Sequence, residues 1–261
     1  MVQAPANLVF IHGMYMTGSS WNAWAERAAA RGYLTHTPSW PFHRGEPADL
    51  RANIDPGLGA LTFADVTGAL KGFLDGFPER PILIGHSIGG LLVQKLVNDG
   101  YAAAGVAISS APPRGIVFFD PHFFRANFPH VNPLAGNRPV VMTPERFHYT
   151  FANTMSVPDS NAAFEQLVVP ESRNVPRSTL TRQARIDFGA PHVPLLFLAG
   201  DRDHLTPASM IRKNVDAYRA PGSVLDYRAF PNRSHLVCNQ DGWEEVADHA
   251  LDWVRARVHG A

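Results

Sequence analysis

Short, continuously apolar segments recur along this chain between longer stretches with helical spacing. Successive side chains of a strand point to opposite faces of a sheet, so a strand that is apolar throughout is buried on both faces. Such strands, separated by helices, predict a parallel sheet covered on both sides. The segments are residues 8–11, 33–37, 81–84, 105–109, 194–199 and 224–230. We therefore expect an α/β fold with about six parallel strands flanked by helices.

Two of the expected helices have recognisable starts. Ser19 or Ser20 can cap a helix that closes near Gly32, because a hydroxyl accepts a hydrogen bond from a free N–H of the first turn. Thr206 followed by Pro207 predicts a second capped start, since proline suits the first helical position.

The pattern of strands and helices is interrupted over residues 111–190, where proline, histidine and phenylalanine cluster. This segment is expected to be a helical insertion between two parts of a core, residues 1–110 and 191–261, with short helices near 144–152 and 160–167. Its aromatic residues predict either a small helical core packed on the sheet or a cap that lines a substrate site, and both can hold together. They are Phe118, Phe119, Phe123, Phe124, Phe128, Phe147 and Phe151.

The charge balance and the cysteine content limit the classes of binding partner and the cellular compartment that we expect. The chain has 23 lysines and arginines against 23 aspartates and glutamates, with no long basic run, which disfavours nucleic acid or an anionic membrane as partner. A single cysteine, Cys238, excludes an internal disulfide, and the N-terminal residues lack the charged and apolar regions of a signal peptide. No apolar run approaches the roughly 18 residues of a membrane span. We expect a cytoplasmic protein that acts on a neutral or apolar small molecule.

The strongest motif is Gly85-His86-Ser87-Ile88-Gly89, which lies between an apolar strand and a helix-forming segment. This G-x-S-x-G pattern is a nucleophile elbow, in which a sharp turn lifts the serine hydroxyl clear of the sheet. The flanking glycines are needed because side chains there would collide with the neighbouring strand and helix. Ser87 is therefore the candidate nucleophile.

Two backbone N–H groups are needed to stabilise the oxyanion of an acyl-transfer reaction. In this architecture they come from the residue after the nucleophile and from the loop after the first strand, which predicts Ile88 and Met14. Gly13 would let the backbone approach the substrate. His12 is better interpreted as a group that fixes this loop than as a catalytic base, and Tyr15 could offer a hydroxyl to the pocket or pack as an aromatic ring.

The acid and the base are expected in the loops after the last two strands. His235 follows segment 224–230 and would exchange a proton with Ser87, while a carboxylate from the preceding loop would hold its tautomer. Asp203 is preferred to Asp201 because it lies further beyond the strand end; Asp201 is suited to a turn. The remaining histidines form no metal-binding pattern, so neither a metal nor a cofactor is expected.

In these motifs and in their order, the chain resembles the α/β-hydrolase superfamily over essentially its whole length. It is most similar to the small capped members, which include plant methyl esterases, hydroxynitrile lyases, bacterial esterases and homoserine-lactone hydrolases. The resemblance implies a cofactor-free site beneath a helical cap, here residues 111–190. The chain departs from the fuller pattern by lacking two N-terminal strands, and residues 38–43 replace the usual aspartate-containing turn.

The favoured function is hydrolysis of a small, largely apolar carboxylic ester or lactone through an acyl-enzyme on Ser87. Two alternatives remain open at this point. A lyase, such as a cyanohydrin-cleaving enzyme, would use Ser87 and His235 without acylation, and a small-ligand receptor would use the same fold without catalysis. The natural substrate and the oligomeric state do not follow from the sequence.

Overall fold

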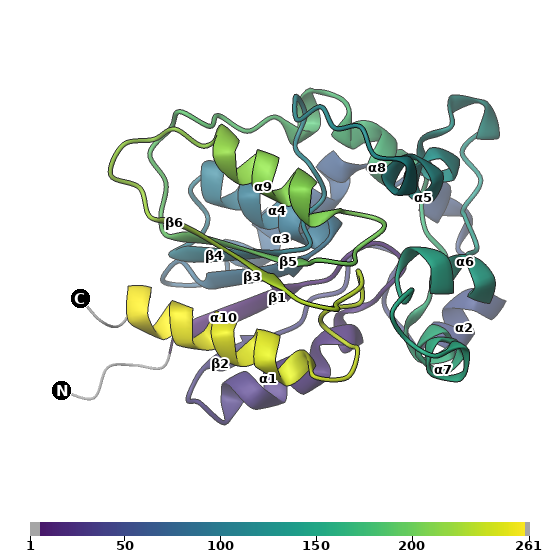
Figure 1. The fold of residues 1–261 in the computed structure, drawn as a ribbon, viewed down its shortest axis with the longest axis horizontal. Coiled ribbons are helices and arrows are strands. Elements are labelled where there is room, and N and C mark those ends of the chain that lie inside the picture. The colour runs from purple at the N-terminus through teal and green to yellow at the C-terminus, as the bar shows by residue number, and fades with distance from the viewer. Residues whose placement is uncertain (1–5, 259–261) are drawn as a thin grey trace.

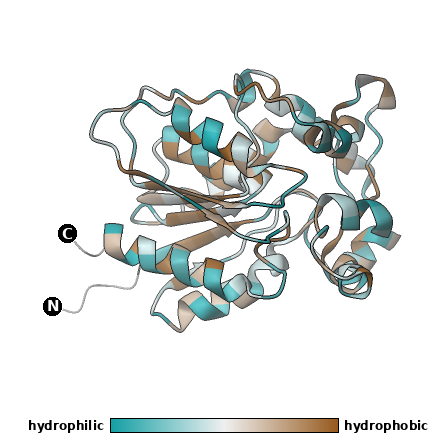
Figure 2. Ribbon diagram, viewed as in Figure 1, coloured by the Kyte–Doolittle hydropathy of each residue, from teal (hydrophilic) through white to brown (hydrophobic). Residues whose placement is uncertain are grey.

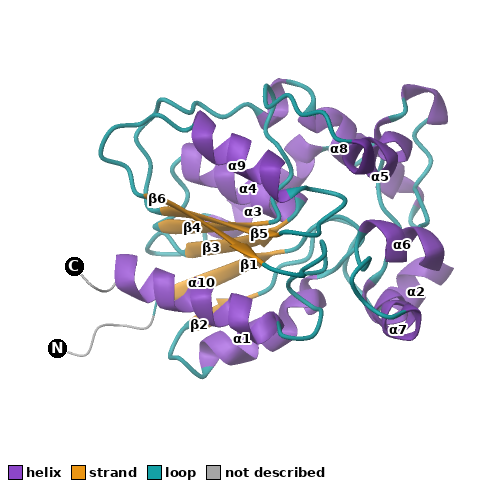
Figure 3. Cartoon of the chain, in the orientation of Figure 1, coloured by secondary structure: helices purple, strands orange, loops and turns teal. Residues whose placement is uncertain are grey.

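The computed structural model describes residues 6–258 and contains a six-stranded sheet in which all neighbouring strands are parallel. The strand order is β2-β1-β3-β4-β5-β6 (Figure 3). The strands are β1 (Asn7–Ile11), β2 (Leu34–His36), β3 (Ile82–His86), β4 (Ala104–Ile108), β5 (Leu195–Gly200) and β6 (Leu225–Phe230). Each of the six apolar segments overlaps a strand, which confirms the predicted fold class.

Alternate residues of the central strands enter two separate cores. Val9 and Ile11 belong to one buried cluster, whereas Leu8 and Phe10 belong to the other. This division follows from the two-residue period of a strand, and it explains why β1, β3, β4 and β5 need apolar residues at nearly every position. Figure 2 shows these strands in hydrophobic colours between helices of mixed colouring.

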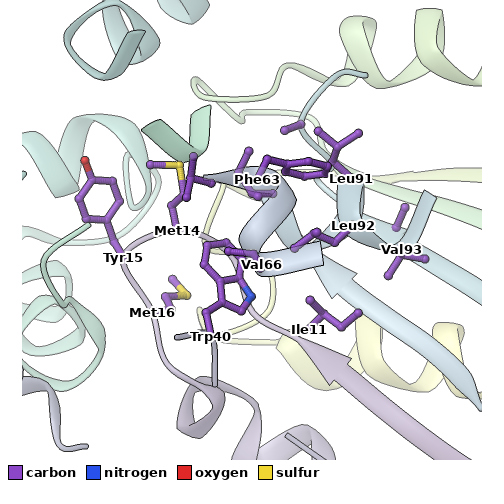
Figure 4. Packing of buried hydrophobic residues seen from close by; sticks show 14 of the residues in the cluster. Ile11, Met14, Tyr15, Met16, Trp40, Phe63, Val66, Leu91, Leu92 and Val93 are labelled. Atoms are coloured by element: carbon purple, nitrogen blue, oxygen red, sulfur yellow. The ribbon is translucent and has the colours of Figure 1, made fainter. Parts of the chain in front are cut away.

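Helices cover both faces of the sheet (Figure 1). One face carries α1 (Asn22–Ala29) and α10 (Trp243–Val258), which bury Trp24 and Val246 against it. The other face carries α3 (Phe63–Leu74), α4 (Ile88–Asn98) and α9 (Ala208–Ala217). Figure 4 shows part of this second core, where Leu91 and Leu92 of α4 pack near Phe63 and Val66 of α3.

The segment between β4 and β5 is mainly helical. It contains α5 (Pro121–Val131), α6 (Pro144–Thr150), α7 (Val157–Leu167) and α8 (Asn174–Thr179), with short 3-10 turns at Pro133–Ala135 and Arg182–Ala184. Helices α6 and α7 lie where short helices were expected, whereas α5 and α8 were not predicted. These helices gather beyond one end of the sheet, beside α2 (Pro47–Ala52) (Figure 1). Arg51 of α2 forms an ion pair with Glu165 of α7 at 2.6 Å.

The first helix begins differently from the prediction. Thr17, not Ser19 or Ser20, is the capping residue, and its hydroxyl accepts from the N–H of Ser19. It caps a 3-10 turn, Gly18–Trp21, that leads into α1. A further 3-10 turn spans Pro56–Ala60. Over residues 6–258, no helix is both long enough and apolar enough to cross a bilayer.

Candidate active site

Ser87 stands at the junction of β3 and α4 with φ 58° and ψ −121°, a left-handed conformation that is strained for a residue with a side chain. The flanking glycines make this turn possible. A Cβ at Gly85 would lie 2.2 Å from the carbonyl oxygen of Gly89, and a Cβ at Gly89 would lie 2.2 Å from the carbonyl oxygen of Ile11. The turn therefore places Ser87 at the N-terminal end of α4, where the helix dipole favours negative charge.

His235 and Asp203 come together in the loops that follow β6 and β5. The Nδ1 atom of His235 lies 2.7 Å from Oδ2 of Asp203, and both side chains are fully buried. The other ring nitrogen, Nε2, is buried and has no hydrogen-bond partner among the described residues. This arrangement leaves Nε2 available as a proton acceptor. Asp201 is exposed in the same loop.

The Asp203 carboxylate is held by two further residues. Its Oδ1 atom accepts from the N–H groups of Leu205 and Thr206, each at 2.8 Å, and its Oδ2 atom accepts from the Thr206 hydroxyl at 2.8 Å. Burial alone would raise the pKa of Asp203, but the charge and hydrogen bond of His235 together with the Thr206 donors hold that pKa below its ordinary value. Asp203 is therefore ionised and fixed in orientation.

Thr206 does not cap a helix as the sequence predicted. Helix α9 begins at Ala208 after Pro207, and no side chain caps it. The Thr206 hydroxyl instead lies 3.0 Å from the carbonyl oxygen of Ser109 and 3.1 Å from Nδ1 of His235, in addition to its contact with Asp203. The prediction was wrong because a buried carboxylate three residues upstream competes for the hydroxyl.

His86 holds the backbone of His235, the candidate base. Its Nε2–H donates to the carbonyl oxygen of His235 at 2.8 Å, and the two rings lie 4.6 Å apart. Burial, followed by the nearby His235, lowers the pKa of His86 to about 3, so the ring is neutral. His86 thus anchors the backbone of His235 without competing for its proton.

The loop after β1 lies close to Ser87. A Cβ at Gly13 would lie 2.9 Å from Cβ of Ser87 and 3.0 Å from the carbonyl oxygen of His86. His12 fixes this loop: its Nδ1–H donates to the Gly13 carbonyl at 2.8 Å, and its Nε2 accepts from the N–H of Trp40 at 3.0 Å. Burial, followed by the nearby His43, lowers the pKa of His12 to about 3. His12 is therefore neutral, and its two hydrogen bonds hold the loop in place.

Tyr15 continues the loop in a left-handed conformation, with φ 64°. Its N–H donates to Oε2 of Glu171 at 3.1 Å, and its carbonyl accepts from the N–H of Val169 at 3.0 Å. Glu171 also contacts Nε2 of His43 at 3.2 Å, and both of these side chains are buried. Residues 111–190 thus bind the backbone directly beside Met14.

A pocket of about 510 Å³ opens above Ser87. Met14 and Ile88, which carry the predicted oxyanion donors, line it together with Ser87. Of the residues predicted to bind substrate, Tyr15, Phe119 and Phe123 line the pocket, whereas Gly13 is not among its lining residues. Phe147 is fully buried in the core. The other phenylalanines that line the pocket are Phe118, Phe124, Phe128 and Phe151.

Within residues 6–258, no group of three or more histidine, cysteine, aspartate or glutamate side chains is arranged to hold a metal ion. Cys238 is buried, and burial raises the pKa of its thiol well above the ordinary value. The described residues therefore offer a serine, not a thiolate, at the pocket.

A model of the alpha/beta hydrolase family matches residues 8–249. This chain belongs to that family. Solved structures with the same fold include a monoacylglycerol lipase from Paleococcus ferrophilus (17% identity, TM-score 0.67, 96% of this chain and 95% of that one). They also include tomato methylketone synthase I complexed with 2-tridecanone (14%, TM-score 0.72, 98% and 100%).

Another solved structure with the same fold is an extracellular alpha/beta-hydrolase from a Paenibacillus species. It is described as sharing structural and functional homology with tobacco salicylic acid binding protein 2. It has 19% identity and a TM-score of 0.70, over 95% of this chain and 98% of that one. No curated protein sequence matched. At these identities the structures share the fold with this chain, and the family membership rests on the sequence model.

Three positions of this hydrolase escaped the sequence analysis. Thr206 had a signal, because a threonine three residues after an aspartate commonly bonds to that carboxylate. His86 lies inside the elbow motif, but its contact with the His235 carbonyl spans 149 residues. Glu171 meets His43 across 128 residues. The roles of His86 and Glu171 depend on tertiary contacts that a local sequence pattern does not predict.

Proposed function

We propose that this α/β-hydrolase cleaves small, largely apolar carboxylic esters or lactones through an acyl-enzyme on Ser87. The observation that carries the proposal is the buried His235 ring, whose Nδ1 faces Asp203 at 2.7 Å while Nε2 has no hydrogen-bond partner among the described residues. An imidazole held in this tautomer is suited to accept the proton of a serine hydroxyl. The strained backbone of Ser87 supports its role as the nucleophile.

The reaction follows the chemistry of a serine triad. The Ser87 oxygen attacks the ester carbonyl carbon while its proton passes to Nε2 of His235, and Asp203 stabilises the imidazolium that forms. The oxyanion accepts hydrogen bonds from the N–H groups of Met14 and Ile88. His235 then protonates the leaving alcohol, and an acyl group remains on Ser87. Water, deprotonated by His235, attacks this acyl group and releases the acid.

The pocket supports a neutral, apolar substrate. Its walls are dominated by phenylalanine and aliphatic side chains, and most of them come from residues 111–190, which we assign as a cap over Ser87. Apolar burial would therefore supply most of the binding free energy. A monoacylglycerol lipase and a complex with 2-tridecanone among the similar folds are compatible with ester chemistry and an apolar ligand.

The proposal is tested with a panel of p-nitrophenyl esters, lactones and cyanohydrins. We expect turnover of esters or lactones, and a mass increase on the peptide that contains Ser87 when a slowly deacylated ester is quenched with acid. Turnover of cyanohydrins alone would assign the protein to lyase chemistry instead. Binding of panel members without turnover of any would favour a receptor.

A further inference from the structure

Among the polar side chains that line the pocket, Tyr15 and His130 form a buried, directly bonded pair that the catalytic steps do not use. Of the other polar side chains of the lining, Arg114 belongs to an exposed residue, and three are engaged with the protein. Thr206 bonds to Asp203, Thr179 donates to the carbonyl of Pro176, and the side-chain N–H groups of Asn127 donate to the carbonyls of Phe123 and Leu205.

The pair is buried and directly linked. The Tyr15 hydroxyl lies 2.7 Å from Nδ1 of His130, and their ring centroids are 5.4 Å apart. Tyr15 is 1% exposed and His130 is 4% exposed. Figure 4 shows Tyr15 turned away from the core around Trp40 and Phe63. The hydroxyl therefore belongs to the side of the loop where residues 111–190 pack.

The pair is close to the catalytic base. The ring of Phe151 contacts both Tyr15 and His235, with its centroid 6.3 Å from that of Tyr15 and 4.9 Å from that of His235. Tyr15 also directly follows Met14, one of the proposed oxyanion donors. A substrate whose carbonyl is bound at Ser87 would thus have the pair within the same pocket.

Both members are uncharged near neutral pH. Burial, followed by the charges of Arg146 and Arg173, lowers the pKa of His130 to about 3. Burial and the nearby Glu171 raise the pKa of Tyr15. A neutral pair holds one O–H and one N–H, and the bond between them uses one of these. The other remains a donor, because no further described residue bonds to Nε2 of His130 or to the Tyr15 hydroxyl.

We propose that the Tyr15–His130 pair binds a second, neutral oxygen of the substrate, such as a ketone, ether or second ester oxygen, and so selects oxygenated esters over plain alkyl esters. This inference rests on the proposed hydrolase function. Charges of both signs lie near the pair: Glu171, Arg146 and Arg173 act on Tyr15, and the two arginines also act on His130. A neutral acceptor satisfies the free donor without adding charge to an apolar pocket.

The hydroxyl is not needed to position the loop. The backbone of Tyr15 is already bound on both sides, by Glu171 at its N–H and by Val169 at its carbonyl. A phenylalanine at position 15 could therefore keep the loop in place while removing the hydroxyl contact. The Tyr15→Phe variant can therefore test the effect of the hydroxyl on substrate selectivity without removing the backbone contacts that hold the loop.

The experiment measures binding to the Ser87→Ala protein by isothermal titration calorimetry, so that it does not depend on turnover. The probes are methyl 4-oxopentanoate, 5-oxohexanoate and 6-oxoheptanoate, each against the methyl alkanoate of equal chain length. An apolar pocket without a donor would bind every oxo ester more weakly than its parent, because the ketone loses hydration. We expect at least one oxo ester to bind about tenfold more tightly than its parent, the effect of one net hydrogen bond.

Adding Tyr15→Phe should remove this preference where the Tyr15 hydroxyl is the free donor, and adding His130→Ala should remove it where Nε2–H of His130 is the free donor. Tyr149→Phe is the matched control, because its hydroxyl also lies near Nδ1 of a histidine, His122 at 3.1 Å, but outside the pocket. It should keep the preference. Circular dichroism checks that each variant folds, and loss of the preference in either folded variant supports the inference.

The inference is overturned if no oxo ester binds more tightly than its parent, or if the preference survives in Tyr15→Phe and His130→Ala. Failure of the hydrolase function itself would be seen separately, as ester turnover that is absent from the wild type or unchanged by Ser87→Ala.

Discussion

Glu171 and His43 form a buried ion pair, 3.2 Å between Oε2 and Nε2, that joins residues 111–190 to the loop after β2. The same carboxylate oxygen accepts from the N–H of Tyr15, and the other accepts from the N–H of Ser172 at 2.7 Å. One side chain therefore ties together three segments around the proposed oxyanion loop. Both its geometry and its charge are testable.

Replacing this carboxylate should destabilise the protein. Glu171→Gln removes the charge from a fully buried group with charged hydrogen bonds, and we expect a loss of about 2 kcal/mol or more in the free energy of unfolding. Glu165→Gln is the control, because the ion pair of Glu165 with Arg51 is largely exposed on the glutamate side and should contribute less than about 1 kcal/mol. Urea denaturation measures both. Equal losses would contradict a special role for Glu171.

The contribution of the pair should depend on pH. Burial alone would lower the pKa of His43, but the charge and hydrogen bond of Glu171 raise it above its ordinary value. A pKa raised on folding adds stability that is complete below the unfolded pKa of about 6.5 and is lost as pH rises through the folded value. The stability difference between wild type and His43→Gln should therefore shrink from pH 6 upward. A difference that grows with pH would show that the pair is not charged as described.

Thr206 should act on the rate through Asp203. Thr206→Val removes the hydroxyl donor to Oδ2 but keeps the shape, and we expect kcat/KM for an ester to fall about tenfold. The loss should increase as pH falls, because the pKa of Asp203 rises when a donor to its anion is removed. Thr206→Ser should restore most of the rate. A merely structural role would give a pH-independent loss that serine does not rescue.

The acid can be assigned by comparing two aspartates in one loop. Asp203→Asn should lower kcat by about 10⁴-fold, because the amide cannot hold His235 in the required tautomer. Asp201→Asn should have little effect, since Asp201 is exposed. Steady-state kinetics of the two purified variants decides the matter. A larger loss for Asp201→Asn would overturn the assignment.

Binding in the pocket should follow chain length. Each added methylene of a short acyl series should raise kcat/KM about three- to fourfold until the pocket is full. Burying one methylene group stabilises the bound state by roughly 0.8 kcal/mol. Phe123→Ala should flatten the series, because Phe123 lines the pocket. Leu134→Ala is the control, since Leu134 is 92% exposed and lies outside it. A flat series for the wild type would mean that the phenylalanines serve only the packing of residues 111–190.

The strands could be predicted because each carries its own evidence. A segment such as residues 81–84, apolar at every position, is typical of a strand that is buried on both faces of a sheet. This segment overlaps β3. The tight turn at Ser87 was equally local, since the glycines of the elbow stand within two residues of it. Features set by neighbours in sequence were therefore visible without the structure.

Other features depended on which segments meet. Helix α5 was not predicted, because Pro129 and a run of aromatic residues hide its helical pattern, although Asp120 and Pro121 form a recognisable start. Thr206 was assigned to a helix cap, because its position in the sequence is compatible both with capping the helix that follows and with a bond to Asp203 upstream. The structure shows the bond to Asp203. The link from Glu171 to His43 had no sequence signal, because neither residue belongs to a motif.

The central claim is that Ser87 performs the reaction, and kcat/KM for the best p-nitrophenyl ester tests it most directly. The measurement compares wild type, Ser87→Ala and Ser19→Ala, the last being an exposed serine in the 3-10 turn before α1. We expect Ser87→Ala to lose at least about 10⁴-fold and Ser19→Ala to retain wild-type activity. Equal turnover by wild type and Ser87→Ala would contradict the account.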